Sequence, residues 1–351
     1  MENVDIIGGG IAGLALAARL DPGRFSVTLH EQRPCLPTVG TTLAMWPEAQ
    51  RALSELGILG AVRDRGAIIT AGALRYPGGE PALSMEGEGL LGVSRTELLS
   101  LLDSAVPSVV RRVTERVEGV PTPTGLTVGA DGVHSVVRQD AWGKRSAAKA
   151  TPFLAVRGVV PLVPSPEDVG EYWGRGEIFG LAPAKGGTNW YASFRSPLGP
   201  GRVDVQEALG AARARYAQYS PAVQHVLSRA TPENSLAQRI WTTPAMARYV
   251  KGSVVLLGDA AHAMTPNLGR GACEALIDAV TLGRLLNDLP LEEALAGYER
   301  KRVFRTQQMR LASALMGRIA LAQRMQPLRD SLLKQAGRQV SRVQGKAKTS
   351  K

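Results

Sequence analysis

The feature that most constrains this chain is a glycine pattern close to its start. Gly8, Gly10 and Gly13 form a G-x-G-x-x-G sequence. Apolar periodicity predicts a strand before the pattern, a helix directly after it and then a second strand, over residues 3–7, 11–20 and 26–30. In such a unit the glycines permit a tight turn, close approach of the backbone to a pyrophosphate, and close packing of helix on strand. The pattern therefore predicts a dinucleotide-binding α/β unit.

An acidic residue supports this interpretation. Glu31 ends the second predicted strand, 18 residues after Gly13, where a carboxylate would bond the ribose of an adenosine. The N-terminus of the helix would offer free N–H groups and partial positive charge to the phosphates. The alternative is a glycine turn in an ordinary α/β protein. Because the strand, the helix and Glu31 stand in register, we favour dinucleotide binding.

Two later motifs carry further polar residues. Residues 129–138 read Gly-Ala-Asp-Gly-x-x-Ser-x-x-Arg, and residues 258–262 read Gly-Asp-Ala-Ala-His after a predicted buried strand at 254–257. Asp259 is placed to accept hydrogen bonds from the ribityl chain of a flavin, and the glycine-rich turn before Gly271 would direct helix N–H groups at an anion. The alternative for Asp259 is a helix N-cap with a turn. His262 is interpreted as a packed residue rather than a catalytic base.

The remaining predicted elements are of two kinds. Helices are predicted at residues 47–56, 96–102, 205–227 and 271–286, and β-rich regions at 67–85 and 153–194. We therefore expect an α/β fold, in which a Rossmann-like FAD domain is interleaved with a β-rich substrate domain and followed by a basic helical tail. The expected boundaries are 1–66, 91–150 and 251–298 for the first, 67–90 and 151–250 for the second, and 299–351 for the tail.

The net charge of +11 is confined to the end of the chain. Residues 300–351 contain 14 Lys or Arg and a single acid, Asp330, whereas the other residues carry a net charge of −2. A neutral body argues against a nucleic-acid partner. Cys35 and Cys273 form no CxxC pair and the four histidines show no metal-ligand spacing, so neither a disulfide framework nor a metal site is predicted.

The tail allows two interpretations. The sequence contains no run of about 18 apolar residues, so we expect no membrane-spanning helix. The first apolar run has no basic segment before it, as a signal peptide would have, and we therefore expect a cytoplasmic protein. In the tail, apolar residues at helical spacing alternate with bases: Leu311, Leu315, Ile319 and Ala322 with Arg310, Arg318 and Arg324. Such a helix packs on its own domain with a solvated basic face, or it makes a peripheral contact with an anionic membrane.

The three motifs, in this order and spacing, resemble those of the class A flavoprotein monooxygenases, and most closely the branch with salicylate hydroxylase-like and zeaxanthin epoxidase-like enzymes. Residues 40–47, the Ser94-Arg95-x-x-Leu98 sequence and residues 172–176 with 190–191 also resemble family segments. The resemblance extends from about residue 3 to 330. Two features depart from the family pattern: Thr42 stands where glycine is usual, and the segment between Val113 and Gly129 is short.

The resemblance implies roles for individual residues. The ADP half of FAD would be held by Gly8, Gly10, Gly13, Glu31, Arg33, Arg95 and Val117. Asp131 is a further candidate for binding the cofactor. Asp259 would bind the ribityl chain, and Pro266, Leu268, Gly269 and Gly271 would lie against the isoalloxazine ring. Arg270 would add positive charge near a reduced flavin, which makes Pro266 and Arg270 the catalytic candidates. Candidate substrate contacts are Arg157, Tyr172, Trp190 and Tyr191.

The function implied by the resemblance is an FAD-dependent monooxygenase. NADH or NADPH would reduce the flavin, and molecular oxygen would form a flavin C4a-hydroperoxide that hydroxylates or epoxidises an electron-rich aromatic or alkene small molecule. One alternative is a flavin-dependent dehydrogenase, oxidase or reductase on the same fold, with no oxygen insertion. A second is a non-catalytic flavoprotein or a binding protein anchored by its tail.

Overall fold

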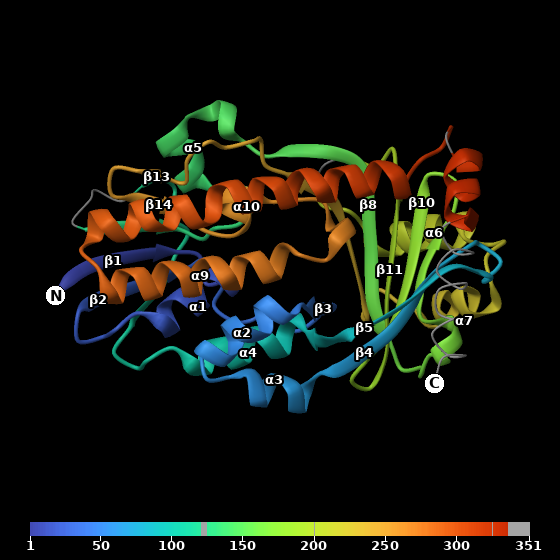
Figure 1. The fold of residues 1–351 in the computed structure, drawn as a ribbon, viewed down its shortest axis with the longest axis horizontal. Helices are drawn as coiled ribbons and strands as arrows, with labels where there is room; N and C mark the ends of the chain where they lie inside the picture. The colour runs from blue at the N-terminus through green and yellow to red at the C-terminus, as the bar shows by residue number, and fades with distance from the viewer. Residues whose placement is uncertain (121–124, 200, 325, 336–351) are drawn as a thin grey trace, which may run out of the picture.

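Two β-sheets contain the strands of this molecule. The computed structural model describes residues 1–120, 125–199, 201–324 and 326–335, with the parallel sheet at one end of the long axis and the other sheet at the opposite end (Figure 1). The first has the order β13-β14-β7-β1-β2-β6, and the second β12-β8-β11-β10-β9-β4-β5-β3. The fold class predicted from the sequence is confirmed.

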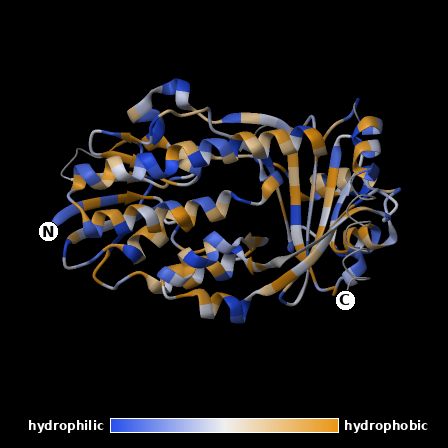
Figure 2. Cartoon of the chain, viewed as in Figure 1, coloured by the Kyte–Doolittle hydropathy of each residue, from blue (hydrophilic) through white to orange (hydrophobic). Residues whose placement is uncertain are grey.

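The first sheet is parallel except for one edge strand. β1 (Glu2–Ile7) lies between β2 (Phe25–Glu31) and β7 (Leu126–Gly129), and apolar residues recur along these strands (Figure 2). The other members are β6 (Arg111–Thr114), β14 (Val254–Leu256) and antiparallel β13 (Val250–Lys251). Because the carboxyl ends of parallel strands share one edge, the loops after β1, β2, β7 and β14 meet there.

Helices pack around this sheet. The helix after β1, α1 (Ile11–Arg19), lies against α9 (Gly271–Asp288) and α4 (Arg95–Ala105). The remaining helices of this part are α2 (Pro47–Glu55), α3 (Leu59–Arg65), α5 (Val136–Trp142) and α8 (Asp259–His262). Each of the predicted helices here is present, with ends within a few residues of those expected.

The second sheet is mainly antiparallel. Its strands are β3 (Thr42–Met45), β4 (Ala67–Arg75), β5 (Pro81–Ser94), β8 (Lys149–Val160), β9 (Gly170–Trp173), β10 (Glu177–Ala184), β11 (Gly187–Arg195) and β12 (Ser235–Thr242). α6 (Val205–Arg215) and α7 (Pro221–Arg229) cover one face of this sheet. The helical composition of residues 205–227 corresponds to two helices, since the chain turns before Pro221, which begins α7.

Two elements cross the predicted domain boundaries. α10 (Leu291–Ala320) is one continuous helix of 30 residues, so the boundary between 298 and 299 falls inside it. It runs beside α9 and reaches the second sheet (Figure 1). β3, assigned to the first domain, pairs with β5 in the second sheet. Within the described residues, no helix is long and apolar enough to cross a membrane. The predicted tail beyond residue 335 lies outside the described residues.

Candidate functional site

The three sequence motifs meet at the carboxyl edge of the parallel sheet. The Ala130 N–H donates to the Ile7 carbonyl over 2.8 Å, and the Leu257 N–H donates to the Gly129 carbonyl over 2.9 Å. The Gly8 N–H donates to the His30 carbonyl over 2.8 Å. Backbone hydrogen bonds between paired strands therefore bring together segments that lie up to about 250 residues apart in the chain.

The first motif forms a tight turn into α1. A Cβ on Gly13 would lie 1.9 Å from the Gly8 carbonyl oxygen, so this close approach admits only glycine. α1 has no acidic residue in its first turn and no side-chain cap, which leaves its first N–H groups for another acceptor. Glu31 lies beside the turn, where its Oε2 accepts from the Gly9 N–H over 2.8 Å.

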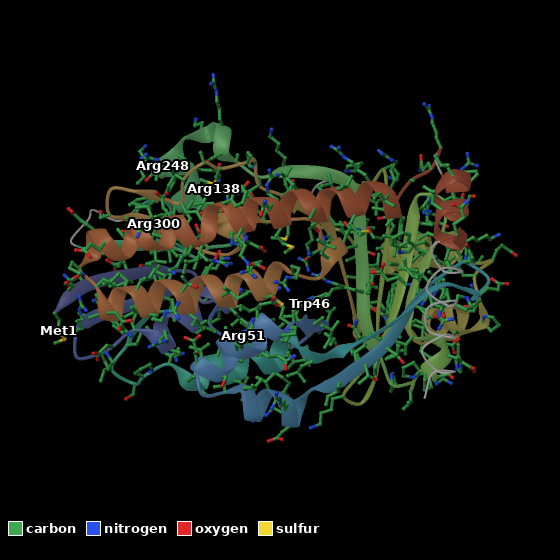
Figure 3. All side chains as sticks on the ribbon, in the orientation of Figure 1. Met1, Trp46, Arg51, Arg138, Arg248 and Arg300 are labelled. Atoms are coloured by element: carbon green, nitrogen blue, oxygen red, sulfur yellow. The ribbon has the colours of Figure 1, made fainter. Side chains whose placement is uncertain are left out.

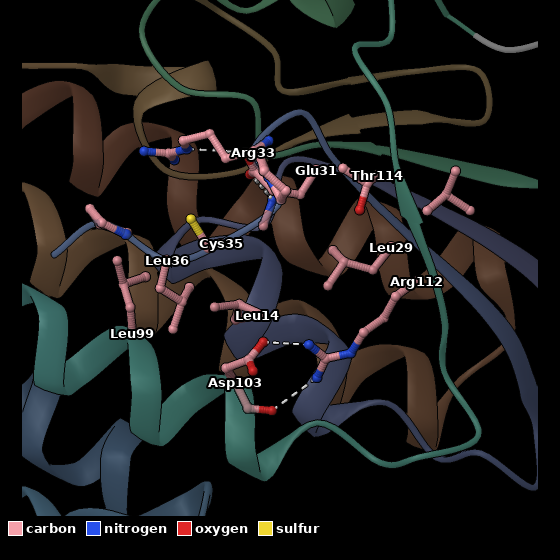
Figure 4. A pocket seen from close by; sticks show the side chains of 14 residues that line it. Leu14, Leu29, Glu31, Arg33, Cys35, Leu36, Leu99, Asp103, Arg112 and Thr114 are labelled. Atoms are coloured by element: carbon pink, nitrogen blue, oxygen red, sulfur yellow. Dashed lines mark hydrogen bonds and ion pairs between the residues drawn. The ribbon is translucent and has the colours of Figure 1, made fainter.

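A cavity of about 280 Å³ opens next to this turn (Figure 4). Glu31 and Arg33 lie on one side of it, and the Arg33 Nε donates to Glu31 Oε1 over 3.2 Å. The ion pair between Asp103 and Arg112 lies at its far end (Figure 4). Cys35 also lines the cavity. A site with a carboxylate beside a glycine turn at a helix N-terminus, and with this volume, suits the adenosine part of a dinucleotide.

Other residues expected around the ADP half lie on neighbouring segments. Arg95 is the first residue of α4, exposed, with its N–H bonded to the Thr41 carbonyl over 3.0 Å. Val117 follows β6 and packs, partly buried, against the core of the parallel sheet, but it does not line the cavity. Gly10 has open space around the position of a Cβ.

The two aspartates of the later motifs differ in their surroundings. Asp131 Oδ2 accepts from the Val136 N–H over 2.7 Å and so caps α5, and burial raises its pKa despite these bonds. Its Oδ1 is buried without a partner in the described structure. Asp259 is exposed although Gly258 and Ala260 beside it are buried. Its carboxylate lies 3.9 Å from the Cβ position of Gly271, next to the start of α9, and is open to a ligand.

Arg138, at the end of the second motif, connects two motifs. It is fully buried, and its guanidinium donates to the Ala260 carbonyl over 2.8 Å and to the Val133 carbonyl over 2.7 Å (Figure 3 shows its place). It thereby fixes the segment that carries Asp259 against the segment that carries Asp131. The motif contained this arginine, but its role depends on a contact across 122 residues, which the sequence does not reveal.

The turn from Pro266 to Gly271 leads into α9. Pro266 and Gly269 are exposed and Leu268 is partly buried. The Arg270 side chain is buried, donates to Glu48 over 3.1 Å and to Glu274 over 2.9 Å, and lies over the Trp46 ring. Burial alone would lower its pKa, but the two carboxylates raise it. Its charge is therefore paired with carboxylates within the protein.

Arg270 belongs to a longer buried network that the sequence did not predict. Arg302 of α10 pairs with Glu274 over 2.5 Å and with Asp278 Oδ1 over 2.6 Å. Asp278 Oδ2 accepts from the Gly258 N–H over 2.9 Å and contacts His262 Nε2 at 2.6 Å. His262 is fully buried, which agrees with its interpretation as a packed residue. The network thus holds the backbone directly before Asp259.

The substrate candidates divide between the two faces of the second sheet. Arg157 and Tyr191 are paired neighbours on β8 and β11, on the face opposite to α6 and α7. Tyr172 and Trp190 are fully buried in the core beneath those helices, with Trp190 stacked on Phe179. They lie on the face opposite to that of Arg157 and Tyr191, because successive residues of a strand alternate between faces.

A polar row crosses the face of this sheet opposite to α6 and α7, where Tyr191 packs against a small cluster that includes Ala320 of α10. Tyr191 lies over Gly180, where a Cβ would be 2.1 Å from its ring, and its hydroxyl reaches Glu171 on β9. The Trp173 Nε1 donates to the other Glu171 oxygen over 2.8 Å. Burial raises the pKa of Glu171 although both hydrogen bonds lower it. Both oxygens of the Glu171 carboxylate therefore accept hydrogen bonds already, and neither is paired with Arg157.

On this face, no described carboxylate pairs with the positive charge of Arg157. Its Nε is buried without a hydrogen-bond partner in the described residues. Burial lowers its pKa to about 10, with a further decrease from Arg95 and a partial offset from Asp259. The side chain therefore lies within electrostatic range of both segments expected to hold the cofactor. A buried cation without a carboxylate is costly unless a ligand supplies the anion.

The residues present fit FAD. The glycine turn with Glu31 and the 280 Å³ cavity accommodate the adenosine end, and exposed Asp259 beside the start of α9 suits the ribityl chain. The chemistry of these donors and acceptors, a carboxylate for hydroxyls and helix N–H groups for phosphate, is that of a dinucleotide site. Within the described residues, no group of three His, Cys, Asp or Glu could hold a metal ion.

Comparison with protein families gives two matches. Residues 94–312 match a family described as FAD binding domain, and residues 6–42 match an NAD(P)-binding Rossmann-like domain. The first match covers the second and third motifs, and the second covers the glycine turn and Glu31.

Individual relatives are similar over almost the whole chain. The aurachin C monooxygenase/isomerase of Stigmatella aurantiaca is 32% identical over 90% of this chain and 88% of its own length. The FAD-dependent urate hydroxylase of Klebsiella pneumoniae is 29% identical over 87% and 86%. The solved structure of Klebsiella pneumoniae HpxO with FAD and uric acid has the same fold, with a TM-score of 0.84, 24% identity and coverage of 95% and 93%.

Proposed function

This chain belongs to the class A flavoprotein monooxygenases, within the family of the FAD binding domain, and from that premise we propose its substrate and the roles of its residues. It is an FAD-dependent monooxygenase. We propose that it uses NADH or NADPH and molecular oxygen to insert one oxygen atom into an electron-rich aromatic or alkene small molecule. Bound FAD supplies the redox chemistry of oxygen activation.

In this proposal the motif residues hold FAD. Gly8, Gly13 and Glu31 bind the ADP half and Asp259 the ribityl chain. The turn from Pro266 to Gly271 presents the start of α9 to the isoalloxazine ring, where helix N–H groups stabilise negative charge. Arg270 acts by fixing this turn, because its own charge is paired with Glu48 and Glu274.

The observation that carries the substrate proposal is the unpaired Arg157. We propose that the substrate is an aromatic acid, phenol or enol whose anionic oxygen pairs with Arg157 on the face of the second sheet opposite to α6 and α7. An ionised ring oxygen also makes the carbon framework richer in electrons. The only other charged group described in the polar row, Glu171, is occupied by Tyr191 and Trp173.

The activity is tested by a screen of aromatic acids for compounds that stimulate NAD(P)H oxidation. We expect stimulation that depends on oxygen, together with a product that is heavier by one oxygen atom when analysed by mass spectrometry. NAD(P)H consumption with hydrogen peroxide as the sole product, for every compound that binds, would instead favour an oxidase or reductase.

Arg157→Gln is expected to change substrate preference. A charge-assisted hydrogen bond contributes about 1.5–3 kcal/mol, so kcat/KM for an acidic substrate should decrease roughly tenfold or more. The rate with its neutral amide analogue should change little. Arg195→Gln, at an exposed position of the same sheet, is the control. An equal loss for acid and amide would assign Arg157 a role other than recognition of the anion.

The proposal includes a peripheral membrane contact through the basic C-terminal region. Residues 300–351 hold 14 bases and one acid, and each base near an anionic bilayer contributes about 1 kcal/mol. The part of this region that the structure describes includes most of α10.

A further inference from the structure

The polarity of α10 is inverted relative to an ordinary surface helix. Its buried side beyond Tyr298 is formed by small and polar residues, namely Arg302, Thr306, Ser313, Gly317 and Ala320. Its exposed side carries the large apolar residues Phe304, Leu311, Leu315 and Ile319, which are 71%, 60%, 58% and 42% exposed. A surface helix normally places its apolar stripe on the core and its polar residues in water.

The four apolar residues form one stripe. They follow one another at intervals of seven, four and four residues, which return to the same side of a helix. The stripe is about 22 Å long at 1.5 Å per residue. The stripe is interrupted at one turn by Gln308, which is exposed. Four large apolar residues aligned on one side of a helix nevertheless differ from single apolar residues scattered over a surface, and they indicate a contact with another surface.

Basic residues flank the stripe. Arg300, Lys301 and Arg318 are exposed and fall on the same half of the helix, and Arg300 lies on the outside of α10 in Figure 3. From residue 300 to 324 the sequence contains seven bases and no acid. The four apolar and three basic residues together are called the outer α10 face here.

We propose that the outer α10 face is a docking surface for an anionic lipid membrane. The apolar stripe would enter the boundary between headgroups and acyl chains, and the flanking bases would pair with anionic headgroups. This is the arrangement of an interfacial helix that lies in the membrane plane. The enzyme would then be held where lipophilic substrates dissolve.

Charge argues against a second copy of this chain as the occupant. A symmetric dimer brings the same patch of both subunits together, so Arg300, Lys301 and Arg318 would lie within an interface whose charged residues are all basic. Like charges opposed across an interface are repulsive, and the outer α10 face offers no acid to balance them. A surface of phospholipid headgroups has the complementary charge.

The test is co-sedimentation of the FAD-loaded full-length protein with vesicles. Vesicles of phosphatidylcholine with one quarter phosphatidylglycerol are compared with pure phosphatidylcholine, at low and high salt. We expect binding to the anionic vesicles at low salt and release at high salt, because salt screens exposed charges. The Leu311→Ser/Leu315→Ser variant should bind roughly tenfold more weakly, whereas Val109→Ser, at an equally exposed site elsewhere, should bind as the original does.

Each contrary result overturns the proposal. Absence of binding at low salt, or equal binding to both kinds of vesicle, excludes an anionic membrane. Unchanged binding of the double variant places the contact on another part of the chain. A dimer in sedimentation velocity that dissociates in the double variant assigns the face to self-association. FAD content and turnover without lipid should be the same in all variants, so these outcomes do not depend on the proposed substrate.

Discussion

Asp259→Ala is expected to lower the affinity for FAD roughly 5- to 150-fold. A hydrogen bond from a ribityl hydroxyl to a carboxylate contributes about 1–3 kcal/mol, and alanine removes both acceptor oxygens. The Asp259 side chain is exposed, so its loss should leave the fold intact. Affinity is measured by titrating the protein with FAD after removal of bound flavin.

The control is Asp288→Ala, which removes an exposed aspartate from the end of α9. It should retain FAD as the original protein does. If Asp259→Ala binds FAD with unchanged affinity at equal thermal stability, Asp259 does not belong to the cofactor site, and the proposed orientation of FAD would have to be revised.

Arg302→Met is expected to lower the free energy of unfolding by about 3–5 kcal/mol. The substitution leaves buried Glu274 and Asp278 with one fewer cation, and breaking a buried ion pair from one side has this typical cost. Thermal or urea unfolding of the FAD-loaded protein measures the change. Arg300→Met, at an exposed position of the same helix, should be neutral to within about 0.5 kcal/mol. A neutral Arg302→Met would mean that water or a shifted Arg270 compensates the carboxylates.

The same network predicts how stability depends on pH. Burial alone would raise the pKa of Asp278, but Arg302 and His262 outweigh it and lower the pKa to about 2. Because the folded-state pKa is below the ordinary value, the carboxylate stabilises the fold fully above pH 4. This contribution is lost between about pH 4 and pH 2. In Arg302→Met the folded-state pKa of Asp278 should rise, because its main cation is removed while burial remains, so this loss of stability on acidification should become smaller or change sign.

The cofactor motifs could be predicted because their signals are local. Gly8 to Gly13, Glu31 and Asp259 each follow a short apolar strand, and the order of these strands is a property of the sequence. The structure places all of them at one edge of the parallel sheet. Their roles in binding FAD remain predictions.

Which face of the second sheet carries the candidate substrate contacts could not be predicted from the sequence. Trp190 and Tyr191 are adjacent in a strand, so they had to lie on opposite faces. Which of the two faces the helices α6 and α7 cover depends on tertiary packing and not on the strand itself. The network around Arg302 was missed for a related reason. Glu274 and Asp278 are acids on an apolar helix, which is a sequence signal, but their partner comes from another helix.

The strand order of the parallel sheet has a consequence for synthesis. β7 is complete by Gly129, but its neighbour β14 begins at Val254. During translation at about 5–20 residues per second, the nascent chain presents β7 as an unpaired edge for several seconds. Unpaired edges are sites of incorrect pairing between chains. This side of β7 therefore gains its partner only after residues 254–256 have been synthesised, and a chaperone that covers β7 during this interval should reduce incorrect pairing.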